Sequence, residues 1–201
     1  MFHFCNLCSY KGVLLKNMQE SNLVDQVKKG NTNAFRFIVA THQKLVVHIV
    51  GRIFLDHDEI QDICQEVFIK VYQRINEFRG ESRFSTWIAS IAYHQCLNHL
   101  RKKRRLNEIA YEEDSTVNNL ITDTSTEQIV ENNETKRLLK QVVESLPLAY
   151  RTVITLFYLE EFSHAEIEQI TGMPEGTVKS NLFRARAILK EKLMNTSLNT
   201  K

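Results

Sequence analysis

The spacing of apolar residues along the chain predicts helices almost throughout. In several segments Val, Ile, Leu and Phe recur every three or four positions, which places them on one face of an α-helix. Gly30 and Asn31 end an early helix, and Asp56 or Asp58 can cap the next one, which runs from 59 to 78. Its expected buried stripe consists of Ile60, Ile63, Val67, Val71, Ile75 and Phe78. Only two prolines and six glycines interrupt the chain. The pattern predicts an all-α protein.

A second face of the same helix mixes carboxylates with apolar groups. Its members are Asp62, Gln65, Glu66, Ile69 and Tyr72. Such a face is either an ordinary solvated surface or a surface that offers charge and apolar area to a partner. The spacing alone leaves both interpretations open.

The following helix begins near Trp87 and leads into an unbroken basic run at 101–105. Between them, His94 and Asn98 occur at helical spacing. Aromatic rings stack on exposed bases, amides read base edges, and cations neutralise phosphates, so this combination suits single-stranded nucleic acid. The alternative is that Trp87 and Ile91 belong to the core, and that the basic run complements the dipole of the helix.

The C-terminal third of the chain has the pattern of a helix-turn-helix. Pro147 fits the first turn of one helix, and Ser163 with Glu166 forms a capping box for the next. Gly172 can take the left-handed conformation that ends that helix. A longer helix follows Pro174, with an outer face formed by Lys179, Ser180, Phe183, Arg184 and Arg186. Such a second helix fits the major groove of B-DNA.

The charge is distributed unevenly along the chain. The segment 106–135 contains eight acidic residues and neither Lys nor Arg, so removing it from the formal total of +2 leaves +10 on the rest. Rich in Ser, Thr and Asn, the segment cannot bury enough apolar surface to order itself, which predicts a flexible acidic linker. The expected organisation is two small basic helical domains and their flanks: a tail at 1–20, a domain at 21–105, the linker at 106–134, a domain at 135–195 and a tail at 196–201.

Several classes of protein are excluded by the sequence. No apolar run approaches the ~20 residues that span a bilayer, and the first fifteen residues lack the pattern of a signal peptide. The four cysteines do not form a disulfide framework, which favours a cytoplasmic protein. Cys5 and Cys8 are half of a zinc site at most, so we predict no metal and no cofactor. Met18 precedes the periodic pattern, which leaves open whether residues 1–17 belong to the native protein.

Catalytic signatures are missing as well. The sequence has neither a glycine-rich phosphate loop nor an H-E-x-x-H motif, and its histidines do not pair with Cys or carboxylates at catalytic spacing. We therefore predict no catalytic residues and no enzymatic activity.

Two groups of motifs resemble those of a known family. The strings 62–68 (DICQEVF) and 78–87 (FRGESRFSTW) resemble domain two of bacterial RNA polymerase sigma factors. The string 163–167 (SHAEI), together with Gly172 and 176–180 (GTVKS), resembles domain four. With only two domains, the chain is similar to the extracytoplasmic-function (ECF) class of sigma factors over roughly residues 21–194.

The resemblance implies partners and site residues. The partners would be core RNA polymerase, through its β′ coiled coil and β flap, promoter DNA, and an anti-sigma factor. The polymerase-binding residues would be Asp62, Gln65, Glu66, Phe68 and Tyr72. Those at the −10 element would be Arg83, Phe84, Trp87, His94, Asn98, Arg101, Lys102 and Arg104. Those at the −35 element would be His164, Lys179, Ser180, Phe183, Arg184 and Arg186.

The leading hypothesis is therefore a non-enzymatic sigma factor that directs promoter-specific initiation. The alternative is a helix-turn-helix regulator that binds DNA without polymerase. The two hypotheses make different predictions for the mixed face of Asp62, Gln65 and Glu66. A sigma factor needs this face to bind polymerase, whereas a regulator that acts without polymerase does not.

Overall fold

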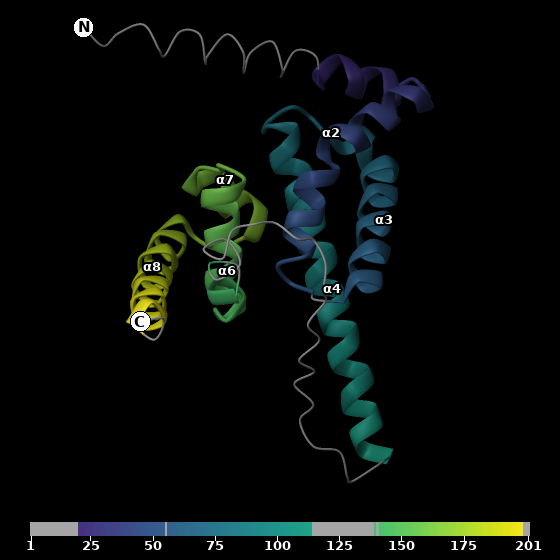
Figure 1. Ribbon diagram of the computed structural model, residues 1–201. Helices are drawn as coiled ribbons and strands as arrows, with labels where there is room; N and C mark the ends of the chain where they lie inside the picture. The colour runs from purple at the N-terminus through teal and green to yellow at the C-terminus, as the bar shows by residue number, and fades with distance from the viewer. Residues whose placement is uncertain (1–19, 55, 114–138, 140, 199–201) are drawn as a thin grey trace, which may run out of the picture.

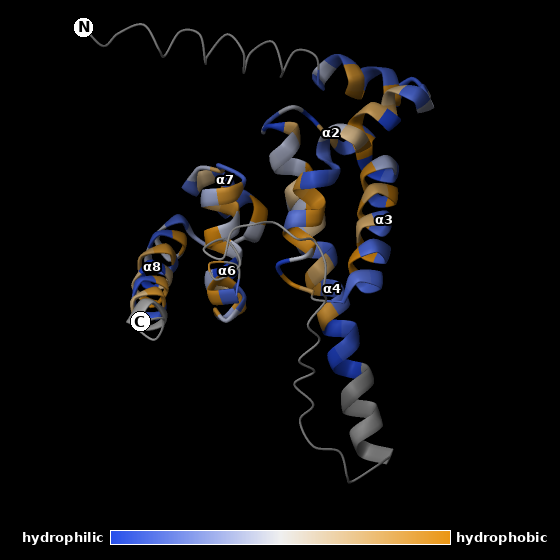
Figure 2. Cartoon of the chain, viewed as in Figure 1, coloured by the Kyte–Doolittle hydropathy of each residue, from blue (hydrophilic) through white to orange (hydrophobic). Residues whose placement is uncertain are grey.

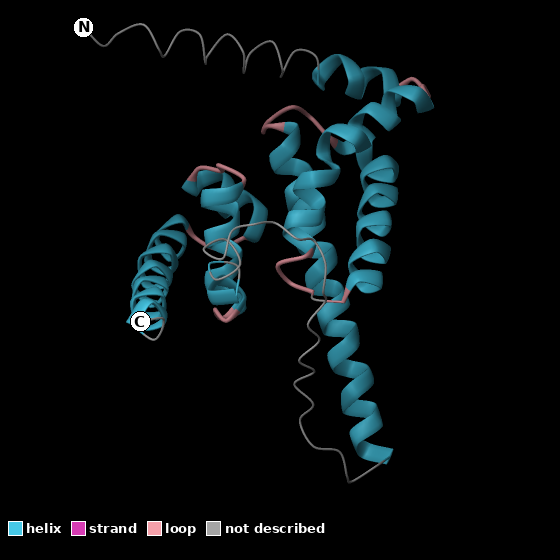
Figure 3. Ribbon diagram, viewed as in Figure 1, coloured by secondary structure: helices cyan, strands magenta, loops and turns pink. Residues whose placement is uncertain are grey.

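The computed structural model describes residues 20–54, 56–113, 139 and 141–198, and these are helical with short turns between the helices (Figures 1 and 3). We call residues 20–113 the first module and residues 139–198 the second module. The helical elements of the first module are 20–28, α2 (Thr32–Val50), α3 (His57–Arg74), the 3₁₀ turn η1 (Ile75–Glu77) and α4 (Phe84–Glu113). Those of the second are 141–144, α6 (Leu148–Ile154), the π-helical turn η2 (Thr155–Leu159), α7 (His164–Thr171) and α8 (Glu175–Leu198).

Local capping residues set the helix starts in the first module. Gly30 has a φ of 89°, a conformation that favours glycine, and it ends the helix 20–28. Asn31 then caps α2 by accepting hydrogen bonds from two backbone amides of its first turn. Asp56 caps α3, because its Oδ1 accepts from the backbone N–H of Glu59 at 2.9 Å. Of the two candidate caps, Asp56 is therefore the one used.

The core of the first module lies between α2, α3 and α4. The predicted stripe is buried along α3, with Ile60 half-buried at its start. The helix ends at Arg74, four residues before the predicted end, so the last two members lie in η1 (Ile75, buried) and directly after it (Phe78, half-buried). The stripe packs against α2 and against the buried side of α4, and Figure 2 shows hydrophobic residues in orange along these helices. The most deeply buried residues of this core are Val46, Val50, Ile63, Val67, Val71, Ile88, Ala89, Ala92 and Cys96.

The second module has the predicted helix-turn-helix. Pro147 stands immediately before α6, and the capping box between Ser163 and Glu166 is complete in both directions. Gly172 follows α7 with a φ of 74°, in the left-handed region. The buried side of α8 is formed by Val178, Leu182 and Ala185.

Helix α4 extends beyond the predicted start of the linker. It continues through residues 106–113, and its C-terminal part projects away from the other helices of the first module (Figure 1). A run of good helix formers, including five consecutive basic residues, is compatible with this extension. The rest of the predicted linker lies outside the described residues, as do Cys5, Cys8 and both terminal tails.

The two modules touch each other. Helix α7 packs against α4, and the turn η2 approaches α2, so the buried residues of both modules form one contiguous cluster. In Figure 1 the green helices of the second module stand beside the blue and teal helices of the first. Within the described residues, none of the helices is both long and apolar enough to cross a membrane.

Candidate nucleic-acid and partner interfaces

The mixed face of α3 is exposed. We call it the α3 face and define it by Asp62, Gln65, Glu66, Phe68, Ile69 and Tyr72. Ile69 is 56% exposed and Tyr72 43% exposed, although both are large apolar or aromatic residues. Phe68 is half-buried against the core and supports the face from below. Ile69 was not among the residues implied by the family resemblance, but the helical spacing had already placed it on this face.

Glu66 connects the α3 face to α4. Its Oε2 accepts hydrogen bonds from Gln95 Nε2 and His99 Nε2, each at 2.6 Å. Gln95 in turn accepts from Lys70 Nζ at 2.7 Å. The hydrogen bond from His99 is the largest cause that holds the pKa of Glu66 below its usual value, assisted by Gln95 and by the charges of His99 and Lys102. Glu66 therefore fixes α4 relative to α3 besides contributing to the α3 face.

The lowered pKa of Glu66 predicts a pH dependence of stability. Because the pKa is lower in the folded than in the unfolded chain, the stabilisation is present above the ordinary value of 4.5 and is lost as the pH falls through the folded value. The wild type should be slightly more stable than Glu66→Gln at neutral pH, and the difference should shrink in acid. Chemical denaturation of both proteins over a pH series measures it, and a constant difference would contradict the assignment.

An aromatic cluster supports the start of α4. Phe84 stacks on Trp87 with ring centroids 5.6 Å apart, and Phe78 contacts both rings. Phe84 is only 4% exposed, whereas Trp87 is half-buried. The expected contact of Phe84 with DNA does not fit this position, because its ring is inside the core. The physical reason is that the Phe84 ring packs against His42 of α2 and against Phe78, whereas Trp87 is only partly covered.

Polar and basic residues continue along one side of α4. We call this the α4 face: Arg83, Trp87, His94, Asn98, Arg101, Lys102 and Arg105. His94 Nδ1 donates to the backbone carbonyl of Ser90 at 2.8 Å, which leaves Nε2 available to a ligand. Asn98, Arg101, Lys102 and Arg105 line one shallow surface pocket.

The side chains of the basic run at 101–105 point to different sides of α4. Arg105 was missed as a candidate, although it lies four residues after Arg101 and thus on the same side of the helix. Lys103 points instead toward α3, where its Nζ lies 3.2 Å from Glu59 Oε2. Arg104 is exposed.

The outer side of α8 carries the expected cationic face. We call it the α8 face: Lys179, Ser180, Phe183, Arg184 and Arg186, opposite the buried side of the helix. Phe183 is 72% exposed, the largest value among the exposed large apolar residues of the described chain. Lys179 pairs with Glu175 at 2.7 Å one turn earlier, and Arg184 is exposed.

Arg186 and His164 rest on a pair of aromatic rings. The Arg186 guanidinium lies 5.8 Å from the ring centroid of Phe157 and 5.5 Å from that of Tyr158. His164 stacks on Phe157, with centroids 5.0 Å apart and an angle of 12° between the planes. Phe157 and Tyr158 thus position two of the predicted DNA-contacting residues. The sequence shows that these two rings, Arg186 and His164 all belong to the second module. Their contacts, however, depend on how η2 lies against α7 and α8, which the sequence does not show.

The described cysteines are shielded. Burial raises the pKa of Cys64 to about 11 and that of Cys96 to about 12, where the nearby Cys64 adds to the effect. Both thiols are therefore poor nucleophiles near neutral pH. Within the described residues, no group of three or more His, Cys, Asp or Glu side chains is arranged to hold a metal ion.

The fold is that of a helical protein with a helix-turn-helix, the class of fold that places a helix in the major groove of DNA, and it has a separate exposed face of mixed charge and apolar groups on α3. Two family models match the chain: Sigma-70 region 2 over residues 38–106 and Sigma-70 region 4 over residues 136–189. The ECF RNA polymerase sigma-E factor of Haemophilus influenzae is 34% identical over 186 residues, which cover 90% of this chain and 98% of that protein. The RNA polymerase sigma-H factor of Pseudomonas aeruginosa is 33% identical and covers 90% of this chain and 96% of its own. The chain therefore belongs to the ECF class of the sigma-70 family of RNA polymerase sigma factors.

Solved structures share the fold. The sigma factor RpoE of Bartonella quintana, solved in complex with the anti-sigma factor NepR, has a TM-score of 0.67 at 21% identity. It covers 80% of this chain and 96% of its own. CnrH, solved with the cytosolic domain of CnrY, has a TM-score of 0.62 at 19% identity and covers 88% and 98%. At these identities the likeness concerns the fold alone.

Proposed function

We propose that this sigma factor binds core RNA polymerase and directs it to promoters through the three faces described above, without catalysing a reaction itself. The observation that carries the proposal is that one chain presents both a helix-turn-helix, whose helix α8 has an exposed cationic face, and an exposed apolar and acidic surface on α3. A regulator that acts without polymerase needs only the first of these. Family membership supports the same choice.

The α3 face is the proposed contact with the β′ coiled coil of polymerase. Exposed Ile69 and Tyr72 supply apolar area, and Asp62 and Gln65 surround them with polar groups. An apolar centre with a polar rim is the usual composition of a protein interface. Phe68 stiffens the face, and Glu66 ties it to α4, so polymerase binding and the α4 face are mechanically linked. The proposed partner of the second module is the β flap.

The α4 face is the proposed site for the melted −10 element. Trp87 at the rim can stack on an exposed base, while His94 Nε2 and Asn98 offer hydrogen-bonding groups to base edges. Extruding a base costs a few kcal/mol, which a stacking surface offsets. The basic end of the helix, with Arg101, Lys102, Arg104 and Arg105, is placed to neutralise phosphates.

The α8 face is the proposed reader of the −35 element as a duplex. A helix with exposed Lys179, Ser180 and Arg184 can enter the major groove, where Arg recognises guanine and Ser contacts several bases. Phe183 offers apolar contact with a thymine methyl group. Arg186 and His164, held by their aromatic supports, lie at the edge of this face for phosphate contact.

Salt dependence tests the docking of α8. Each lysine or arginine that neutralises a phosphate contributes about one unit to the slope of log affinity against log salt. Lys179→Ala, Arg184→Ala and Arg186→Ala should therefore each lower the slope by about 1, measured by fluorescence anisotropy with a duplex that contains the −35 site. Lys29→Ala, at an exposed position of the first module, removes the same charge away from α8 and is the control. Unchanged slopes in all three variants would argue against the α8 face.

The proposed location, domain roles and inhibitory partner all follow from the proposal that the chain binds RNA polymerase. A bacterial sigma factor acts in the cytoplasm, and we assign residues 21–105 and 135–195 to its two functional domains with an acidic tether between them. An anti-sigma factor is the proposed inhibitory partner, because the similar sigma factor RpoE of Bartonella quintana was solved in complex with the anti-sigma factor NepR.

The decisive experiment is run-off transcription. Purified chain and core polymerase are combined with fragmented genomic DNA of the source organism, and start sites are mapped. Discrete start sites that share two sequence elements are expected. Core polymerase alone is the control. If the purified chain binds duplex DNA but neither joins polymerase nor directs initiation, the regulator alternative is correct.

A further inference from the structure

Two consecutive aromatic side chains of η2 contact a single cation of α8. Phe157 is half-buried and Tyr158 is 51% exposed, and their ring centroids lie 5.0 Å apart with an angle of 82° between the planes. Adjacent residues of a regular α-helix do not share one face. Both rings nevertheless lie close to the Arg186 guanidinium, at 5.8 and 5.5 Å. The turn η2 is π-helical rather than α-helical, and such turns are frequent at functional sites.

Arg186 is held by these two rings rather than by a carboxylate. A guanidinium within about 6 Å of an aromatic ring is attracted by the negative face of the ring. Lys179, on the same helix, instead pairs with Glu175 at 2.7 Å. In the described part of the chain, no carboxylate lies within ion-pair distance of Arg186. The aromatic contact therefore orients its planar N–H donors and leaves them available to an anion.

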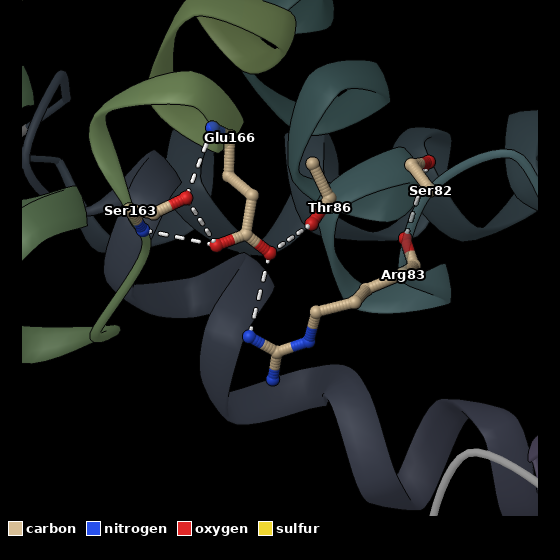
Figure 4. A network of polar contacts seen from close by, with 5 residues as sticks. All are labelled: Ser82, Arg83, Thr86, Ser163 and Glu166. Carbon is tan, nitrogen blue, oxygen red and sulfur yellow. Dashed lines mark hydrogen bonds and ion pairs between the residues drawn. The ribbon is translucent and has the colours of Figure 1, made fainter. Parts of the chain in front are cut away.

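His164 is fixed beside the same aromatic pair. Its ring stacks on that of Phe157, and its backbone directly follows the cap of α7. At this cap the backbone N–H and the hydroxyl of Ser163 both donate to Glu166 Oε2 at 2.9 Å (Figure 4). The capping box thus holds the backbone of His164, and the stacking holds its side chain.

The donor groups lie along one edge of α8. Lys179 and Arg186 are seven residues apart, so they lie one above the other on the helix. The pKa of Glu175 is held below its usual value, mainly by the hydrogen bond and charge of Lys179 and to a smaller extent by the charge of His164. His164 is therefore near this edge as well. When a helix lies in the major groove, its edges face the phosphates of the two strands, and its centre faces the bases.

We propose that Tyr158, Arg186 and His164 form one phosphate site at this edge of the α8 face, and that Tyr158 donates a hydrogen bond from its hydroxyl to the DNA backbone. Tyrosine is among the residues that bind DNA phosphates, and arginine and histidine supply further N–H donors. Phe157 is a positioning residue, which orients Arg186 and His164 without touching DNA. The inference rests on the proposed function of the α8 face and adds Tyr158 and Phe157 to it.

Tyr158→Phe tests the direct contact, because it removes the hydroxyl and keeps the ring. Fluorescence anisotropy with the full chain should show about 2- to 10-fold weaker binding of the −35 duplex, the effect of one lost hydrogen bond. A duplex of scrambled sequence should show the same fold loss, since phosphate contacts carry no sequence information. The urea midpoint should not change, because the side chain is exposed. Tyr150→Phe makes the same chemical change on α6 and is the matched control.

Neutral phosphates test whether the three side chains share one site. Duplexes that each carry a single methylphosphonate remove one backbone charge at a time. The wild type should lose affinity at a particular position, and this loss should be smaller in Tyr158→Phe and in Arg186→Ala, because both variants already lack part of the contact. Equal losses in the three proteins at every position would overturn the shared site.

The salt dependence tests the role of Phe157. Phe157→Leu should lower the slope of log affinity against log salt by about one, as Arg186→Ala does, whereas Phe157→Tyr keeps an aromatic ring and should retain the slope. In the Arg186→Ala background, Phe157→Leu should not lower the slope further. A purely structural role would lower stability and leave the slope unchanged. If circular dichroism shows that Phe157→Leu loses helix, Tyr158→Leu replaces it with the same expectation.

The outcomes separate this site from the α8 face as a whole. Unchanged DNA binding by Tyr158→Phe overturns the direct contact, and a loss confined to the −35 sequence would assign the hydroxyl to a base instead. If Lys179→Ala and Arg184→Ala weaken binding while Tyr158→Phe does not, the phosphate site is rejected and the α8 face is retained. If none of the three variants changes binding, or the wild type does not bind the duplex, the α8 face itself is wrong.

Discussion

Asp62→Lys is expected to weaken the binding of core RNA polymerase by tenfold or more without changing the fold. Asp62 is exposed on α3 beside Gln65 and Ile69, so its reversal does not disturb the core. Placing a like charge against a complementary partner surface costs several kcal/mol. Affinity measured by biolayer interferometry with core polymerase, together with thermal denaturation, separates the two effects.

Asp62 makes a cleaner test than Glu66. Reversal of Glu66 would also break its hydrogen bonds from Gln95 and His99, and a loss of binding could then come from a displaced α4. Asp25→Lys, on the exposed side of the helix 20–28, is the matched control and should bind normally. Normal polymerase binding by Asp62→Lys would remove Asp62 from the proposed interface.

Leu182→Ala is expected to destabilise the second module by about 2–5 kcal/mol, the cost of leaving a cavity at a fully buried leucine. Leu182 is 1% exposed on the inner side of α8. Because small domains are stable by only about 5–15 kcal/mol, this loss is a large part of the total. Urea denaturation followed by circular dichroism measures it, and a change below about 1 kcal/mol would contradict the packing described.

The neighbouring position supplies the control. Phe183 is 72% exposed, so Phe183→Ala should change the free energy of unfolding by no more than about 0.5 kcal/mol. If the α8 face reads DNA, the same variant should nevertheless lose affinity for the −35 duplex. The two adjacent substitutions are thus expected to separate folding from DNA binding.

Local signals in the sequence were sufficient for the positions of the helices and for several of their ends, but not for the end of α3 at Arg74 or of α4 at Glu113. Ser163, Glu166 and Gly172 act within one or two turns of the chain, so their roles as cap and terminator were predictable and are confirmed. The same holds for Asp56, and for the buried stripe of α3, which follows from spacing alone.

Contacts between distant residues were not predictable in this way. Phe84 is as suitable as Trp87 for stacking on a base, and only its packing against Phe78 and His42 shows that it is buried. Besides capping α7, Glu166 accepts a hydrogen bond from the hydroxyl of Thr86, which lies eighty residues earlier in the chain. Such pairings are set by the tertiary arrangement, which periodicity does not encode.

The projecting end of α4 has an evolutionary consequence. At 1.5 Å per residue its 30 residues extend about 45 Å, and the part that carries the basic run has left the hydrophobic core behind. Residues 101–105 are exposed, so substitutions among them should cost little folding stability. If the α4 face binds the −10 element as proposed, selection can alter promoter preference there at that small cost. Among relatives that recognise different promoters, we therefore expect sequence differences to accumulate at this C-terminal end of α4 before they appear at its N-terminal end.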